Sequence, residues 1–115
     1  MDNTLPQDET AVDVDKVKEA LDIKADVTVV DVRTPEEYQE GNIAGSVLVP
    51  LQDLQGQQEQ LGKIPDKEKT LYVHCKKGVR GAQAVEILRS LGYTDVHNVT
   101  GGIDEWILRN YPVQK

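Results

Sequence analysis

The sequence has 115 residues but contains only one cysteine, two histidines, one tryptophan and no phenylalanine. A single cysteine excludes an intramolecular disulfide, and with two histidines the ligand spacings of a structural zinc site are missing. With so few aromatic residues, the core must consist mainly of Val, Leu, Ile and Ala, which suits strands covered by helices. Cys75 must therefore serve either packing or chemistry, and no metal site is expected.

Basic residues are also in the minority, since 13 Lys and Arg stand against 20 Asp and Glu, for a formal net charge of -7. Such a charge discourages nonspecific binding to nucleic acids or acidic membranes, so we expect no direct nucleic-acid binding. No apolar run approaches the roughly 18 residues needed to cross a bilayer, and segment 1–10 lacks the apolar stretch of a signal peptide. We therefore expect a cytoplasmic protein without membrane contacts.

The length of the chain suits one domain with one core. Hydrophobic and charged contents of 38% and 29% are ordinary for a globular protein and do not indicate disorder throughout the chain. Residues 1–11 are mostly polar and include Pro6, so we predict a flexible tail there and a single domain over 12–115. The tail leaves open whether this chain is a whole protein or a domain cut from a longer one.

Strand and helix patterns alternate along the predicted domain. β-Branched, apolar runs predict strands, and apolar residues at three- and four-residue steps predict helices. We expect strands at 27–32, 46–49, 71–74 and 96–99, and helices from 13, from 34 to about 41, at 52–62, 80–91 and 103–109. This order predicts an α/β layered fold with a largely parallel sheet in which strand 27–32 is central.

Cys75 stands at the end of a predicted strand and just before a predicted helix, where open α/β sheets bind ligands. Unpaired amides and the positive end of the helix dipole make this position suitable for an anion. Lys76, Lys77 and Arg80 add positive charge, which favours the thiolate over the thiol. Gly78 can take a positive φ, so that the amides of the loop converge on the sulfur.

A lone cysteine after a strand can also be a small buried packing residue, which is a common role of free cysteine. Three cations within six residues of an acidic protein favour chemistry over packing. Lys76 and Lys77, taken without Cys75, fit a solvated surface pair better than a binding site, and their significance comes from standing next to Cys75. His74 is the last strand residue and should point away from Cys75, which favours a structural role over that of a general base.

Three parts of the sequence together resemble the rhodanese-like sulfurtransferases, over about residues 12–113. The first signature of that family resembles Asp31-Val32-Arg33, Glu37-Tyr38, Gly41-Asn42-Ile43-Ala44-Gly45-Ser46 and Pro50, and its closing signature resembles Gly101-Gly102-Ile103 with Trp106. Between them, Cys75 matches the catalytic cysteine that begins a six-residue loop. The resemblance implies a three-layer α/β/α fold whose central, mostly parallel sheet has about five strands.

The resemblance also implies a sulfurtransferase that needs no cofactor. Cys75 would attack the outer sulfur of thiosulfate or a persulfide donor and hold it as a persulfide until a thiol or cyanide accepts it. The residues that bind the donor and stabilise the persulfide would be Lys76, Lys77, Gly78, Val79 and Arg80. Asp31 and Arg33 would brace the loop, and a plain structural ion pair is an equal alternative. A relay role would add a protein partner that delivers sulfur, but the physiological donor and acceptor stay open.

The sequence departs from the family pattern at Asn42, where His is common, and at Gly81, where Ser is frequent. The first removes a titratable group, and the second removes a hydroxyl that could cap the following helix. The related phosphatases and arsenate reductases use a longer loop that would need an arginine at Gly81, which disfavours that activity. A catalytically weak docking or regulatory module is the remaining alternative, and the intact Cys75 argues against it.

Overall fold

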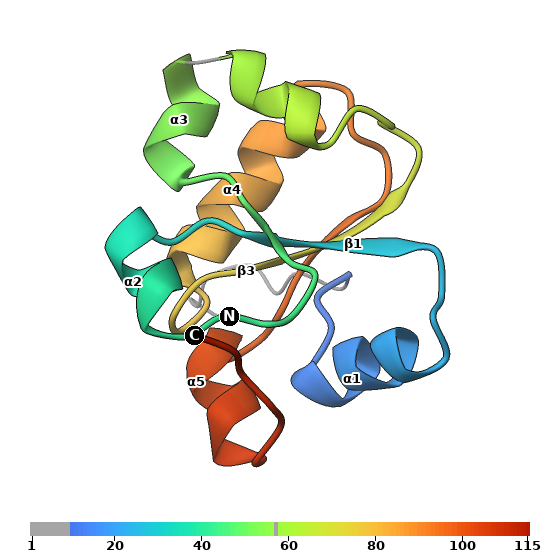
Figure 1. Ribbon diagram of the computed structural model, residues 1–115. Helices are drawn as coiled ribbons and strands as arrows, with labels where there is room; N and C mark the ends of the chain where they lie inside the picture. The colour runs from blue at the N-terminus through green and yellow to red at the C-terminus, as the bar shows by residue number, and fades with distance from the viewer. Residues whose placement is uncertain (1–9, 57) are drawn as a thin grey trace, which may run out of the picture.

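A parallel sheet of four strands lies at the centre of the computed structural model, which describes residues 10–56 and 58–115 (Figure 1). The strands follow the order β2-β1-β3-β4 and are β1 (Val27–Asp31), β2 (Val47–Leu48), β3 (Thr70–His74) and β4 (Val96–Asn98). The predicted strand 27–32 therefore corresponds to β1 in the interior of the sheet. All three strand pairs are parallel.

The expected number of about five strands is wrong for the described residues, which form four. The first segment that could extend the sheet makes only an isolated parallel bridge between Val12 and Val99. After Val12 the pairing ends, because Asp13 directly caps the first helix by accepting a hydrogen bond from the amide of Lys16 at 2.9 Å. Most of the predicted tail, residues 1–9, lies outside the described residues, while the carbonyl of Thr10 is 2.6 Å from Nδ1 of His97.

Five α-helices and one 3₁₀-helix are described around the sheet in residues 10–56 and 58–115. They are α1 (Val14–Asp22), α2 (Pro35–Glu40), α3 (Leu51–Gly56), η1 (Gln58–Lys63), α4 (Val79–Ser90) and α5 (Gly102–Leu108). The prediction of one helix over 52–62 was wrong, since the segment divides into α3 and η1. Between Leu54 and Leu61 the sequence has no apolar residue whose burial could stabilise a continuous helix.

Helices α3 and α4 lie on one face of the sheet and helices α1 and α5 on the other, which confirms the predicted α/β/α arrangement (Figure 1). Val30 and Val73 point to the layer of α3 and α4, where Ala84, Val85 and Leu88 pack against them. Their strand neighbours Val29 and Tyr72 point to the layer of α1 and α5, whose core residues are Val14, Val17, Ile103 and Trp106. Burial on both faces explains why the strands are apolar with little alternation. Within the described chain, no helix combines the length and apolar character needed to cross a bilayer.

Candidate active site

Cys75 is the first residue after β3, and a short loop leads from it into α4. Gly78 ends this loop in the left-handed region, with φ at 116°, where side chains other than glycine are disfavoured. This conformation turns the Gly78 amide towards the start of the loop, and it donates a hydrogen bond to Sγ of Cys75 at 3.0 Å. The predicted contact between the loop amides and the sulfur is therefore present at Gly78.

The N-terminus of α5 holds the same loop from the other side. The amides of Ile103 and Asp104 donate to the carbonyls of Cys75 and Lys76 at 2.9 and 3.0 Å. Gly102 permits this approach, since a Cβ there would lie only 2.4 Å from the carbonyl oxygen of Cys75. In the sequence, the glycine pair at 101–102 stood out only as part of the closing family signature, although adjacent glycines also indicate a close approach of backbone segments.

The three cations that follow Cys75 all have carboxylate partners. Nζ of Lys76 and Nζ of Lys77 lie 3.0 and 3.6 Å from the carboxylate of Asp104. Arg80 donates two hydrogen bonds, of 2.7 and 3.0 Å, to Glu37 in α2. Asp104 lies 28 residues from Lys76, and Glu37 lies 43 residues from Arg80, so the sequence contains no local signal for these pairs.

The Arg80 guanidinium lowers the pKa of Glu37 to about 2, with further help from the backbone amide of Thr34. Glu37 also closes a capping box at the start of α2, because its carboxylate accepts from the Thr34 amide at 3.0 Å. One carboxylate therefore stabilises the start of α2 and connects it to the start of α4. Val79, the remaining residue of the predicted donor-binding set, has 71% of its surface exposed.

The thiol of Cys75 is enclosed, with only 1% of the residue exposed to solvent. It packs within the core cluster between the sheet and α4. A cavity of about 180 Å³ adjoins the loop at Lys76 and is also lined by Arg33, Glu37, Glu40 and Asp104. In this conformation, a reactant can reach Sγ only after side chains around the loop move.

The family model of the rhodanese-like domain matches residues 13–109, which is most of the chain. The chain belongs to the rhodanese-like domain family. Its sequence is 40% identical over 73 residues to thiosulfate sulfurtransferase PspE of Escherichia coli, covering 63% of this chain and 67% of PspE. It is 32% identical over 77 residues to the uncharacterized protein YqhL of Bacillus subtilis, covering 67% of this chain and 58% of YqhL.

A solved rhodanese-related protein from Thermoplasma volcanium has the same fold, with a TM-score of 0.77 and 36% identity. The match covers 90% of this chain and 96% of that structure. The expected fold is thereby confirmed, apart from the number of strands.

In this rhodanese-like domain, Asp31 and Arg33 form a buried ion pair at the carboxyl end of β1. Nη2 of Arg33 is 2.7 Å from Oδ2 of Asp31, and the two side chains are only 6% and 0% exposed. Arg33 also donates to the carbonyl of Gly41 at 2.7 Å. Nε2 of His74 lies 3.7 Å from Asp31, and Nδ1 lies 3.2 Å from the carbonyl of Cys75. These contacts place Asp31 and Arg33 next to the strand that carries the cysteine.

His74 is almost completely buried, which lowers its pKa, although Asp31 opposes the shift. Burial therefore favours the neutral imidazole. A neutral, enclosed ring that contacts Asp31 agrees with the structural role expected for His74.

The two departures from the family pattern have structural explanations in this rhodanese-like domain. Gly81 is buried in α4, and a Cβ there would lie 2.3 Å from Oδ1 of Asn98. Asn98 uses its amide to donate to the carbonyl of Gly78 at 3.1 Å, which supports the turn beside Cys75. Asn42 connects two other segments, since it donates to the carbonyl of Tyr38 at 2.9 Å and accepts from the Gln114 side chain at 2.9 Å.

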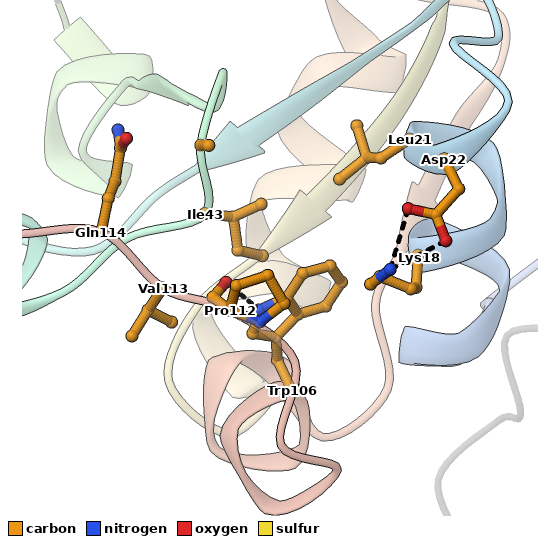
Figure 2. A pocket seen from close by; sticks show the side chains of 9 residues that line it. Lys18, Leu21, Asp22, Ile43, Trp106, Pro112, Val113 and Gln114 are labelled. Carbon is orange, nitrogen blue, oxygen red and sulfur yellow. Dashed lines mark hydrogen bonds and ion pairs between the residues drawn. The ribbon is translucent and has the colours of Figure 1, made fainter.

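A larger cavity of about 380 Å³ lies in the layer of α1 and α5 (Figure 2). Its apolar lining includes Leu21, Ile43, Trp106 and Val113. The indole nitrogen of Trp106 already donates to the carbonyl of Pro112 at 2.8 Å. None of residues 75–80 lines this cavity, so Cys75 and the charged residues around it lie apart from it, at the loop after β3.

Proposed function

We propose that this rhodanese-like domain is a sulfurtransferase that moves sulfane sulfur from thiosulfate or a persulfide to a thiol or cyanide through a persulfide on Cys75. The observation that carries this proposal is the hydrogen bond of 3.0 Å from the Gly78 amide to Sγ of Cys75 at the carboxyl end of β3. A sulfur atom that accepts from a backbone amide, directly before a helix N-terminus, is stabilised as an anion. Similarity to a relative named thiosulfate sulfurtransferase supports the same chemistry.

The proposed reaction consists of two displacements at sulfur. In the first, the thiolate of Cys75 attacks the outer sulfur of thiosulfate; a bond forms between Sγ and that sulfur, and the sulfur–sulfur bond of the donor breaks. Sulfite leaves with the electron pair, and Cys75 carries a persulfide anion. In the second, cyanide attacks the outer sulfur of the persulfide, thiocyanate leaves, and the thiolate is regenerated. A thiol acceptor takes the sulfur in the same way and leaves as its own persulfide.

The neighbouring residues have separate roles in this proposal. The amides from Lys77 through Arg80, with that of Gly78 already in contact, stabilise the charge on the thiolate and the persulfide. Lys76 and Lys77 contact the sulfonate of the donor. The ion pair of Asp31 and Arg33 supports the end of β1 next to the loop. No cofactor enters the reaction, and a protein persulfide can serve as donor in a relay.

The enclosed position of Cys75 adds a requirement to the proposal. With 1% of the residue exposed, the thiol reacts only when the side chains around the loop move apart. Lys76 and Lys77 are suited to such movement, because their side chains are 53% and 73% exposed and exposed ion pairs contribute little stability. The part of the loop that packs against the core stays in place, while the exposed side chains of Lys76 and Lys77 move apart.

The proposal is tested by intact mass after the reduced protein is mixed with thiosulfate. We expect a gain of one sulfur atom, roughly 32 Da, that cyanide removes and that is absent in Cys75→Ser. The sequence contains no second cysteine, so a sulfur adduct on a thiol must be on Cys75. Failure of thiosulfate and of small persulfides to give an adduct would overturn the proposal and favour a docking module.

A further inference from the structure

The cavity beside the cysteine loop contains more negative than positive side chains. Its lining includes the carboxylates of Glu37, Glu40 and Asp104 and the cations of Arg33 and Lys76. Arg33 is paired with Asp31 at 2.7 Å and is buried, so its charge is already balanced. Glu37 is likewise paired with Arg80, and Asp104 with Lys76 and Lys77. Among the described residues no cation pairs with Glu40, so a negatively charged donor that enters through this cavity approaches one carboxylate whose charge is not balanced.

The loop itself has little positive charge left for a dianion. Lys76 and Lys77 share Asp104, and Arg80 is paired with Glu37 through two hydrogen bonds. These three cations and two carboxylates have a net charge of one positive unit, and the thiolate of Cys75 balances it. Thiosulfate would bring two further negative charges to a site that is already neutral.

We propose, on the basis of the sulfurtransferase function above, that the preferred donor is a persulfide carried on an uncharged or cationic group, and that Asp104 and Glu40 disfavour anionic donors. In this step the Cys75 thiolate attacks the terminal sulfur of the donor R–S–SH. A bond forms between Sγ and that sulfur, the sulfur–sulfur bond of the donor breaks, and the thiolate R–S⁻ leaves with the electron pair. The proton stays on the transferred sulfur and is lost when the new persulfide ionises.

The expected selectivity follows from the charges near the donor. A unit charge about 4 Å away in water changes a rate by about fivefold. Asp104 and Glu40 both line the cavity, with Asp104 closer to the loop through its contacts with Lys76 and Lys77. The charge of the donor should therefore matter even when the reacting sulfur atoms are identical.

A series of three small persulfides tests this inference. Persulfides of cysteamine, 2-mercaptoethanol and 3-mercaptopropionate have the same S–SH group but carry a positive, a neutral and a negative end. We expect the second-order rate of sulfur addition to Cys75, measured by quenched-flow mass spectrometry, to fall by about fivefold at each step. Thiosulfate should react more slowly than all three.

Asp104→Asn should reduce the rate differences among the donors. The rates with 3-mercaptopropionate persulfide and thiosulfate should increase about fivefold, and the rate with cysteamine persulfide should decrease. Glu40→Gln should act in the same direction. The matched control is Asp26→Asn, which also removes one carboxylate but stands before β1, at the opposite end of the sheet from Cys75. In the control variant, the three donors should keep the same order of rates and the same ratios between them.

The outcomes separate this inference from the function on which it rests. If the three persulfides add sulfur at equal rates, or if Asp104→Asn changes all donors alike, the charge selectivity is wrong and the sulfurtransferase function stands. If none of the donors places sulfur on Cys75 in the wild-type protein, the proposed function itself fails. Far-UV circular dichroism and the thermal midpoint of each variant show that it is folded.

Discussion

At the scale of single residues, two glycines let backbone and side chains approach each other around Cys75. Gly102 brings α5 against the carbonyls of Cys75 and Lys76, and Gly81 leaves room for Asn98. They differ in conformation, since Gly102 has φ at 57° and Gly81 is an ordinary helical residue in α4. Strain in the backbone and steric contact can therefore be measured separately in this site.

Gly102→Ala should destabilise the protein by about 3 kcal/mol or more, because it adds a close contact to a left-handed backbone. Its Cβ would lie 2.4 and 2.5 Å from the carbonyl oxygens of Cys75 and Lys76. Gly45→Ala is the matched control, since Gly45 has φ at 83° and no atom within 4 Å of a built Cβ; it should cost about 1 kcal/mol. Urea unfolding gives both values, and equal values would contradict the close contact.

Gly81→Ala should also destabilise the protein, by about 1 to 3 kcal/mol, even though alanine favours a helix by about 1 kcal/mol over glycine. The contact of 2.3 Å between a Cβ and Oδ1 of Asn98 outweighs this preference. Gly62→Ala, where a Cβ meets open space, should be neutral or slightly stabilising. Adding Asn98→Ala to Gly81→Ala should cost less than the sum of the two single variants, and additivity in chemical denaturation would contradict this explanation.

At the scale of elements, the start of α2 and the start of α4 are joined by the ion pair of Glu37 and Arg80. The Glu37 side chain is 25% exposed and that of Arg80 is 34% exposed, so the pair is partly protected from solvent. The pKa of Glu37 is lowered from 4.5 to about 2, chiefly by the hydrogen bonds from Arg80. A lowered pKa in the folded state means that the charged form of Glu37 stabilises the fold.

This stabilisation should be complete above about pH 5 and disappear as the pH falls towards 2, because Glu37 is then protonated in the folded state as well. After allowance for solvent screening, we expect about 1 to 2 kcal/mol at neutral pH. The difference in unfolding free energy between the wild type and Glu37→Gln should therefore shrink between pH 5 and pH 2. Glu36→Gln, one residue earlier in α2, is the control for loss of charge near the helix start, and an equal pH dependence in both variants would argue against the ion pair.

Local patterns in the sequence were sufficient to predict most elements but not the charge balance of the site. The run from Val27 to Asp31 and the cap at Thr34 act within a few residues, so strand β1 and helix α2 were predicted close to their observed limits. The pairing of Lys76 with Asp104 depends instead on how α5 packs against the loop. The Gln-rich segment after Leu54 was mispredicted because its helices depend on contacts with the rest of the core rather than on an apolar pattern of their own.

At the scale of the whole molecule, two hydrophobic clusters share one sheet. Each of β1 and β3 contributes alternate residues to both, as Val29 and Val30 or Tyr72 and Val73 do. Loss of the packing in either cluster therefore exposes one face of the same two strands. Cys75 belongs to the cluster of α4, and Trp106 belongs to the cluster of α5, so the single cysteine and the single tryptophan lie in opposite layers.

Because the clusters share the sheet, damage to one layer should lower the stability of the other by the same amount. Leu88→Ala removes a fully buried side chain from α4 and should cost about 2 to 5 kcal/mol. In guanidinium unfolding, the midpoint from Trp106 fluorescence should fall together with the midpoint from far-UV circular dichroism, as in two-state unfolding. Leu108→Ala, at a position that is 74% exposed in α5, should shift neither midpoint appreciably. Separate transitions for the two signals in Leu88→Ala would show that the layer of α1 and α5 keeps its packing without the other, in which case the sheet does not couple Cys75 to the rest of the domain.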